Sequence, residues 1–430
     1  MAMKPVLQVA LDFIDLKRAL TLAGEAVKGG VDWIEAGTPL IKAEGLEAVR
    51  ALKKQFPGKI IVADMKTMDV GRAEVEIAAK AGASVVGILG AASDETIKEA
   101  VAAARNYGAK VIVDLIEVKN PVARARDAER LGADYVGVHI PVDDQMKGKT
   151  CLDVVSKVAS AVSIPVSAAG GIHSGNAAAV VKAGASIIVA GGSITKSPDA
   201  RAAVSRIKKA MNTGAAIFSE RFRRVDEKNI LAALGKVSAA NLSDALHRAA
   251  PLKNIFPVFA SGKIAGRAVT VRTAPGDWAK PVQAIDIASP GDIIVVDAGG
   301  TSPAVWGELA TTSAVLKKLA GVVIYGGIRD VSDIKKIKFP SYASVITPQA
   351  GEPRGFGEIG VTIDIGGVKI SSGDWILADE DGVMVVPSAT VVESANRAMD
   401  VLEKEERLRT EIKAGKTLSE LAELLKWEKK

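Results

Sequence analysis

The chain is poor in cysteine and in aromatic side chains, with one cysteine and 4% aromatic residues among 430. The single cysteine, Cys151, excludes an internal disulfide framework and is typical of a protein in a reducing cytosol. Residues 1–5 do not have the layout of a signal peptide, and no uninterrupted apolar run is long enough to span a membrane. We therefore expect a cytoplasmic protein that has no membrane partner.

The chain also lacks a cluster of positive charge. Its net charge is +6, and Lys and Arg are interspersed with Asp and Glu along the whole length. A nucleic-acid-binding face needs clustered cations with aromatic side chains among them, so we expect no direct nucleic-acid partner. A slight basic excess suits small anionic substrates equally well. The length predicts two domains, and abundant alanine and glycine are typical of tightly packed α/β units.

The first half contains eight short apolar runs of strand type, separated by segments with the pattern of helices. A typical helical segment begins after Ser93, carries acids in its first turn and ends at Gly108. Alternating strands and helices predict parallel βαβ units, and eight such units predict a TIM (β/α)8 barrel. An open doubly wound sheet is the alternative, but it would not ordinarily place a polar residue after nearly every strand. The predicted strands are residues 7–11, 33–36, 60–63, 85–89, 110–113, 135–138, 164–168 and 187–190.

Polar residues follow most of these strands, at the edge of a barrel that carries catalysis. They are Asp12, Glu35, Asp64 with Lys66, Asp114 with Glu117, and His139. Asp64 and Lys66 alternate on an extended chain, so their side chains should point the same way, whereas Asp69 belongs to the following loop. A D-x-K-x-x-D pattern by itself more often marks a solvated salt-bridge cluster, but the other strand-end residues favour an active site.

These residue types suggest a chemistry. Glu35 and Asp64 are hard oxygen ligands on neighbouring strands, too few for Ca²⁺ but suited to Mg²⁺, which keeps waters and takes ligands from a substrate. Such an ion can stabilise an enediolate formed next to a carbonyl. Lys66 should stay cationic where negative charge develops, and His139 could move protons.

Two glycine pairs follow the seventh and eighth strands: Gly170-Gly171 and Gly191-Gly192. Glycine-rich turns allow backbone N–H groups to approach a phosphate closely, and barrels often bind phosphate after these two strands. Either pair alone would mark only a turn. Together they predict a phosphate monoester as substrate.

The stretches V-A-L-D (residues 9–12), I-E-A-G-T-P (34–39) and A-D-M-K-T-M-D (63–69) resemble the 3-hexulose-6-phosphate synthase family. This family belongs to the orotidine 5'-monophosphate decarboxylase superfamily, and the likeness covers about residues 1–210. It implies a reversible, Mg²⁺-dependent aldol condensation of formaldehyde with D-ribulose 5-phosphate to D-arabino-hex-3-ulose 6-phosphate. A sugar-phosphate decarboxylase of the same superfamily is the alternative.

The resemblance also implies roles for individual residues. Glu35 and Asp64 would hold the metal, and Asp12 and Lys66 would contact the sugar phosphate. Asp69 would enter the partner subunit's site across a dimer, and His139 would transfer a proton. The phosphate would be bound by Gly170, Gly171, Gly191 and Gly192.

The pattern changes in the second half, and we place the boundary near residue 215, giving domains 1–214 and 215–430. Short strands lie closer together, Gly-Asp pairs open two of them, and helices are fewer, mainly residues 304–319 and the C-terminal stretch. This predicts an α/β domain with layered sheets and mixed strand direction. Residues 391–430 should form a helical tail, split at Gly415, that packs on the domain or on a neighbouring subunit.

The polar cluster of this half is Arg329-Asp330, directly after a predicted strand at residues 322–324. Spacing alone would favour a structural ion pair that has no role in binding or catalysis. However, residues 225–395 resemble the family of the ribonuclease E activity regulator A and the 4-hydroxy-4-methyl-2-oxoglutarate aldolases, which have a swivelling β/β/α fold. The resemblance implies that Arg329 binds a 2-oxoacid carboxylate and that Asp330 positions Mg²⁺, with a loop at residues 307–309 completing the site.

This half could therefore be a 2-oxoacid aldolase or decarboxylase, or equally a non-catalytic module that binds an RNA-processing protein. The resemblances also imply a homo-oligomer, with a dimer through the barrel and trimers through the second domain.

Overall fold

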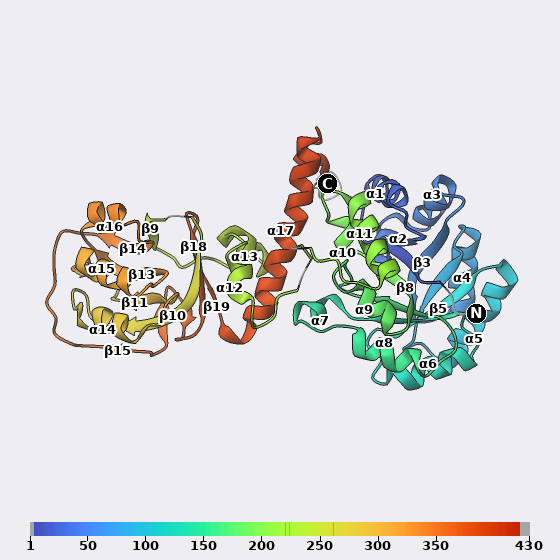
Figure 1. The fold of residues 1–430 in the computed structure, drawn as a ribbon, viewed down its shortest axis with the longest axis horizontal. Coiled ribbons are helices and arrows are strands. Elements are labelled where there is room, and N and C mark those ends of the chain that lie inside the picture. Colours follow the sequence, from blue (N-terminus) through green and yellow to red (C-terminus); the bar gives the residue numbers. More distant parts are fainter. Residues whose placement is uncertain (1–3, 220, 223, 261, 422–430) are drawn as a thin grey trace. The chain divides into compact units, whose positions relative to one another are not determined.

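The computed structural model describes residues 4–219, 221–222, 224–260 and 262–421 (Figure 1). The chain folds into two compact units. The first runs from the N-terminus to Arg224 and also includes the segment from Glu403 onward, whereas the second spans Val225–Leu402. The sequence prediction placed the boundary near residue 215 and gave the whole C-terminal tail to the second domain. In the structure, the tail from Glu403 lies with the barrel.

The first unit is a closed barrel of eight parallel strands in sequence order, as predicted. Each strand pairs with the next, and β1 closes the ring by pairing with β8. The strands are β1 (Val6–Leu11), β2 (Trp33–Ala36), β3 (Ile60–Thr67), β4 (Val85–Leu89), β5 (Lys110–Asp114), β6 (Tyr135–His139), β7 (Val166–Ala169) and β8 (Ala185–Ala190).

Helices surround this barrel, and the helix that the sequence predicts between Ser93 and Gly108 is present. Helix α5 starts after Ser93, whose hydroxyl oxygen accepts a hydrogen bond from the Thr96 N–H at 3.1 Å, and it ends at Gly108 in the left-handed region. The helices are α1 (Leu16–Gly29), α2 (Thr38–Glu44), α3 (Glu47–Gln55), α4 (Gly71–Lys80), α5 (Asp94–Tyr107), α6 (Pro121–Arg130), α7 (Val142–Met146), α8 (Leu152–Ala159), α9 (Ala177–Lys182), α10 (Gly192–Thr195) and α11 (Ala200–Thr213).

The second unit is built on a mixed sheet in the order β19-β18-β10-β11-β13-β14-β9, with β12 paired to β13 and β15 paired to β10. The central strands β10, β11, β13 and β14 are parallel, and β9, β18 and β19 are antiparallel, so the predicted mixed direction is confirmed. The strands are β9 (Phe256–Phe259), β10 (Ile264–Arg272), β11 (Ile293–Asp297), β12 (Ala304–Trp306), β13 (Gly321–Ile328), β14 (Ser341–Ile346), β15 (Glu358–Ile359), β16 (Ile363–Ile365), β17 (Val368–Ile370), β18 (Trp375–Asp379) and β19 (Gly382–Val386).

One helix of this unit was predicted too long. Residues 304–306 form strand β12, and the helix α15 (Glu308–Leu316) begins only after Gly307. Pairing with β13 keeps these three residues buried and extended, which overrides their local pattern. The other helices are α12 (Ile230–Leu234), α13 (Ala239–Ala245), α14 (Ala279–Ile287), α16 (Val331–Ile337), the 3-10 turn Ser388–Thr390, α17 (Val391–Lys413) and α18 (Leu418–Leu421).

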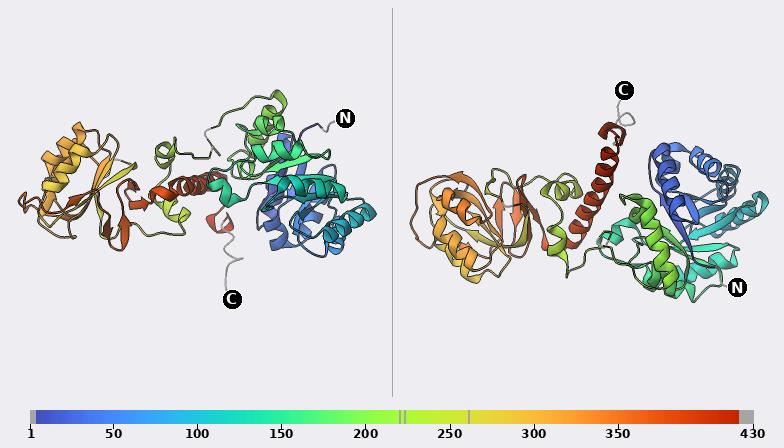
Figure 2. Two further views of the ribbon diagram at one scale, coloured as in Figure 1. Left: turned by 90° about the horizontal axis from the view of Figure 1, so that it is seen from below. Right: turned by 45° about the horizontal axis from the view of Figure 1, so that its top comes forward.

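Helix α17 is uninterrupted in every view, and its C-terminal half belongs to the first unit (Figure 2). There, the buried Arg407 donates to Glu25 at 2.9 Å, to Glu411 at 2.7 Å and to the carbonyl oxygen of Ser197 at 3.0 Å. A buried arginine is stable only when its charge and donors are satisfied, so this network fixes the tail on the barrel. Within the described part of the chain, no helix has both the length and the apolarity needed to cross a membrane.

Candidate active site at the mouth of the barrel

Strand alternation builds this site above an apolar layer inside the barrel. That layer includes Trp33, Val62, Tyr135 and Val189. Because side chains on one face of a strand recur every second residue, Glu35 follows Trp33 and Asp64 follows Val62 on the same inward face. By the same rule, Asp114 lies two residues after the inward-facing Ile112, and His139 lies four residues after the inward-facing Tyr135, so both side chains face the interior of the barrel. The predicted residues therefore converge on the carboxyl end of the barrel.

The centre of the site is an ion-pair network around Lys66. Its ammonium donates to both carboxylate oxygens of Asp64, at 2.8 and 2.7 Å, and to Oδ2 of Asp114 at 2.9 Å. Burial disfavours the charged form, but the carboxylates of Asp114 and Asp64 outweigh it and raise the pKa of Lys66. Lys66 therefore remains a cation at all physiological pH values.

The backbone at Lys66 differs from the extended conformation that we predicted. Its φ is 51°, and the pairing of β3 with β4 shifts between Ala63 and Thr67, as at a β-bulge. A non-glycine residue in this region is strained, and such strain is often found at functional sites. The bulge re-aims the lysine so that it reaches Asp114 as well as Asp64.

Asp114 is the residue whose central place sequence reasoning missed, although its position at a strand end was noted. Burial would raise its pKa, but hydrogen bonds and charge from His139 and Lys66 lower the pKa of Asp114 to about 2. Its Oδ2 lies 3.1 Å from Nδ1 of His139. Because an ionised carboxylate only accepts hydrogen bonds, Nδ1 carries the proton, and Nε2 of a neutral His139 is left as a base.

Glu35 and Asp12 complete a group of carboxylates close to Asp64. Glu35 is buried and accepts a hydrogen bond from Gln8 at 2.5 Å. Burial, followed by the negative charges of Asp64 and Asp12, raises the pKa of Glu35 well above its ordinary value. Burial of the carboxyl group and the charge of Asp64 likewise raise the pKa of Asp12. A cation placed among these carboxylates would relieve their repulsion.

These oxygens fit Mg²⁺, because they are hard donors in mutual electrostatic range. Among the described residues, no group of three or more His, Cys, Asp or Glu side chains is arranged to hold a metal ion. An ion held by Glu35 and Asp64 would therefore take its other ligands from water and substrate. Asp64 is further oriented by Thr38, whose hydroxyl donates to Oδ2 at 2.9 Å, a contact not predicted from the sequence.

Glycines shape the rim of the site. A Cβ atom at Gly37 would lie 2.2 Å from Oδ1 of Asp12, so only glycine allows this close approach. Gly191 faces Oδ2 of the same carboxylate, and Gly192 begins α10. Gly170 and Gly171 have φ of 104° and 67°, which L-residues rarely adopt. The first turn therefore has a backbone conformation that favours glycine, and the binding of a phosphate by the two turns stays a prediction.

Two acidic side chains near the mouth do not join the network. Asp69 is exposed, and its carboxylate accepts a hydrogen bond from the N–H of Val70 at 2.7 Å. Glu117 is exposed as well. The role of Asp69 in a partner's site stays a prediction.

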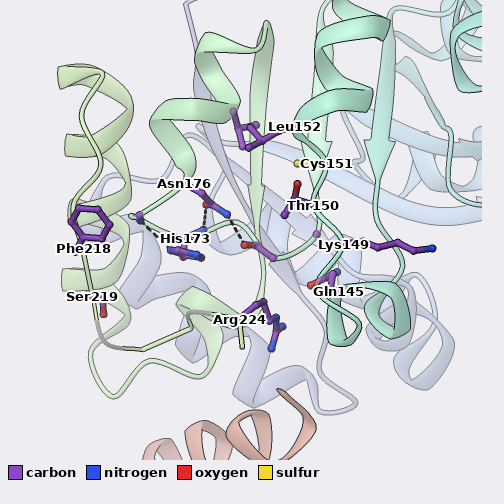
Figure 3. A pocket seen from close by; sticks show the side chains of 15 residues that line it. Gln145, Lys149, Thr150, Cys151, Leu152, His173, Asn176, Phe218, Ser219 and Arg224 are labelled. Carbon is purple, nitrogen blue, oxygen red and sulfur yellow. Dashed lines mark hydrogen bonds between the residues drawn. The ribbon is translucent and has the colours of Figure 1, made fainter. Parts of the chain in front are cut away.

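A pocket of about 270 Å³ lies behind the first glycine pair (Figure 3). It is lined by Gly170 and Gly171, the loop before α8, the loop before α9 and residues from the connection to the second unit. None of the network residues lines it.

In the second unit, Arg329 and Asp330 lie at the end of β13. Nε of Arg329 is 3.4 Å from Oδ2 of Asp330, and the same oxygen accepts a hydrogen bond from the Glu308 N–H at 3.1 Å. A Cβ at Gly307 would lie 2.5 Å from this oxygen, so the glycine lets the loop come close. The predicted loop at residues 307–309 therefore lies beside the predicted pair.

Comparison with known proteins gives two family matches. Residues 5–207 match the model of the orotidine 5'-phosphate decarboxylase / HUMPS family, and residues 239–385 match that of the RraA-like family, described as aldolase/RraA. The 3-hexulose-6-phosphate synthase of Mycobacterium gastri is 44% identical over 205 residues, which are 48% of this chain and 99% of that protein. That of Bacillus subtilis (strain 168) is 36% identical over 209 residues, 48% of this chain and 99% of that protein. A crystal structure of 3-hexulose-6-phosphate synthase is 44% identical, covers 48% of this chain and 99% of its own, and has a TM-score of 0.45.

Proposed function

Since its first unit belongs to the orotidine 5'-phosphate decarboxylase / HUMPS family and residues 239–385 form an RraA-like domain, we propose that the chain is a two-domain lyase whose barrel joins formaldehyde to D-ribulose 5-phosphate. The product would be D-arabino-hex-3-ulose 6-phosphate, and the reaction would be reversible. The observation that supports this most directly is the buried network of Asp64, Lys66, Asp114 and His139 at the barrel mouth.

The roles of the residues follow from their contacts. Nε2 of His139 would take the proton from C1 of the ketose, and the Nδ1–H bond to Asp114 would stabilise the imidazolium that forms. The electron pair left on C1 would form the new bond to the formaldehyde carbon as its C=O π bond breaks, and the resulting alkoxide would take back the proton held by the His139 imidazolium. Lys66, held by two carboxylates, would stabilise the negative charge that develops on the ketose oxygens.

Glu35 and Asp64 would hold Mg²⁺, which supplies Lewis-acid stabilisation of an enediolate when it is bound. The two glycine turns would bind the phosphate through backbone N–H groups, and Asp12 would contact a sugar hydroxyl. A coupled assay on the whole chain tests this function. Formaldehyde consumption that depends on ribulose 5-phosphate is expected, whereas CO₂ release from a keto-acid sugar phosphate would favour the decarboxylase alternative.

For the second unit we propose a 2-oxoacid aldolase or decarboxylase site. Arg329 would bind the carboxylate, and Asp330 would position Mg²⁺ or its waters. The loop at Gly307 and Glu308 that closes on Asp330 supports this assignment. Mg²⁺-dependent cleavage of a pyruvate aldol would test it. Capture of a ribonuclease without such turnover would instead favour a binding module.

Exposed apolar side chains support the proposed oligomers. Met68 and Val70, which flank Asp69, are 54% and 60% exposed, and Leu309 and Leu316 on α15 are each 80% exposed. Apolar side chains of this size rarely remain exposed together unless a partner covers them. We propose a dimer through the loop of Asp69, trimers through the second unit and a cytoplasmic location. Light scattering of the whole chain measures the oligomeric state.

A further inference from the structure

The pocket behind the first glycine pair is closed by residues that lie beyond the family match of the barrel. That match ends at residue 207, whereas Phe218, Ser219 and Arg224 line the pocket. We call the described residues of this segment, which are 214–219, 221–222 and 224, the linker. In Figure 3, Phe218 lies on one side of His173, Arg224 lies below it with its guanidinium directed away from the ring, and Lys149 extends outward.

The linker is held to the barrel at Ile217 and to helix α17 at Arg221 and Phe222. The N–H of Ile217 donates to the carbonyl oxygen of Ser174 at 2.9 Å, and the Ser174 hydroxyl donates back to the Ile217 carbonyl at 2.7 Å. Further on, the N–H of Phe222 donates to Glu403 at 2.5 Å, and Arg221 pairs with Glu406 at 3.2 Å. The wall that carries Arg224 is therefore held in place by hydrogen bonds.

The charge of the pocket has one sign. No carboxylate occurs among the described residues that line it, whereas the cationic side chains of Lys149 and Arg224 do. Lys149 is paired with Asp144 at 2.8 Å outside the lining. Nε of Arg224 is buried and has no hydrogen-bond partner among the described residues. A buried donor of a charged group without a partner is costly, and an anion would remove this cost.

We propose that this pocket is an anion site for a phosphate or phosphate ester, with the Arg224 guanidinium as its charged donor. Arginine binds phosphate oxygens through two parallel hydrogen bonds, and the hydroxyls of Thr150 and Ser219 line the same space. The volume of about 270 Å³ suits a small ligand. The proposal rests on the cavity and the arginine, so it does not require the aldol activity.

Two sources could supply this anion. One is the phosphate end of the sugar substrate, because Gly170 and Gly171 border both the pocket and the barrel mouth. The other is a separate phosphorylated compound, which would hold the linker against the barrel.

Calorimetric titration of the whole chain with inorganic phosphate tests the site. Arg224→Gln should weaken a phosphate-binding component by about tenfold or more, as expected for loss of a charged hydrogen bond. Arg221→Gln is the matched control, since Arg221 lies in the same linker and pairs with Glu406 outside the pocket lining. It should change the affinity less than about twofold.

Arg224→Lys keeps the charge but loses the Nε donor, so it should bind phosphate more weakly than the wild type and more tightly than Arg224→Gln. Equal affinity of the wild type and Arg224→Gln would overturn the proposal. Equal weakening by Arg224→Gln and Arg221→Gln would overturn it too, because only overall charge would then matter.

Steady-state kinetics separate the two sources. A raised KM for ribulose 5-phosphate with unchanged kcat in Arg224→Gln identifies the substrate phosphate as the ligand. Loss of phosphate binding with unchanged KM identifies a separate compound. The titration needs no turnover, so failure of the aldol assay leaves this test intact.

Discussion

The two predicted sites of this chain differ in how firmly their charges are held. At the barrel mouth, Lys66 makes three contacts of 2.7–2.9 Å with Asp64 and Asp114, and all three side chains are largely buried. In the second unit, Arg329 and Asp330 form one contact of 3.4 Å, and their side chains are 42% and 36% exposed. Lys66 is already held in place to stabilise a developing negative charge, whereas the arrangement of Arg329 and Asp330 depends on the ligand that binds beside them.

The largest effect should come from the carboxylate shared by the metal pair and the lysine. Asp64→Asn should lower the condensation rate by about 10³-fold or more, because the site loses both a hard metal ligand and the charge that orients Lys66. The measurement is formaldehyde consumption with ribulose 5-phosphate at saturating Mg²⁺. Asp127→Asn, which removes only a surface pair with Arg130, is the control and should keep full activity. Full activity of Asp64→Asn would refute the mechanism.

Asp114→Asn sharpens the comparison by testing a strand-end residue to which the sequence assigned no catalytic role. The amide cannot hold the lysine and the imidazolium with the same charge, so kcat should fall by about 10²-fold, with a smaller change in KM. Pre-steady-state and steady-state rates of condensation measure the changes in kcat and KM separately. A change in KM alone would show that Asp114 only binds substrate.

The buried network should also make barrel stability depend on pH. The pKa of Asp114 is lowered to about 2, so its stabilising contribution is complete above its unfolded-state pKa of about 3.9 and is lost as the pH falls through about 2. The difference in unfolding free energy between wild type and Asp114→Asn should therefore shrink, by on the order of 2 kcal/mol, between pH 4 and pH 2. Denaturant unfolding followed at several pH values checks this. A difference that stays constant over that range would contradict the assigned pKa.

Arg329→Ala should have the smallest effect on the fold. An exposed pair contributes at most about 1 kcal/mol, so the melting temperature should hardly move, and the condensation rate should stay within about twofold. Any cleavage of a pyruvate aldol should disappear. Retained cleavage in this variant would remove Arg329 from the second site.

Much of the barrel could be predicted from the sequence, because each strand is a local apolar run and each helix has local end signals. The bulge at Lys66 and its contact with Asp114 could not, since Asp114 lies 48 residues further along the chain and no local pattern indicates either feature. The strand β12 was predicted as helix because its pairing with β13 is not local.

The position of the C-terminal tail could not be predicted either, because the contacts that fix it are not local in the sequence. Arg407 contacts Glu25, which is 382 residues away, and nothing in the local pattern of the helix indicates that partner. The candidate residues at the mouth were predictable because catalytic side chains follow strand ends in this fold, but their hydrogen-bond partners were not.

Deuterium exchange at C1 of ribulose 5-phosphate tests the central claim most directly. With Mg²⁺ in D₂O and without formaldehyde, the wild-type chain should exchange this proton, as followed by loss of its NMR signal, and the variants Asp64→Asn and His139→Ala should exchange it far more slowly. Exchange at the wild-type rate in both variants would contradict the proposed site.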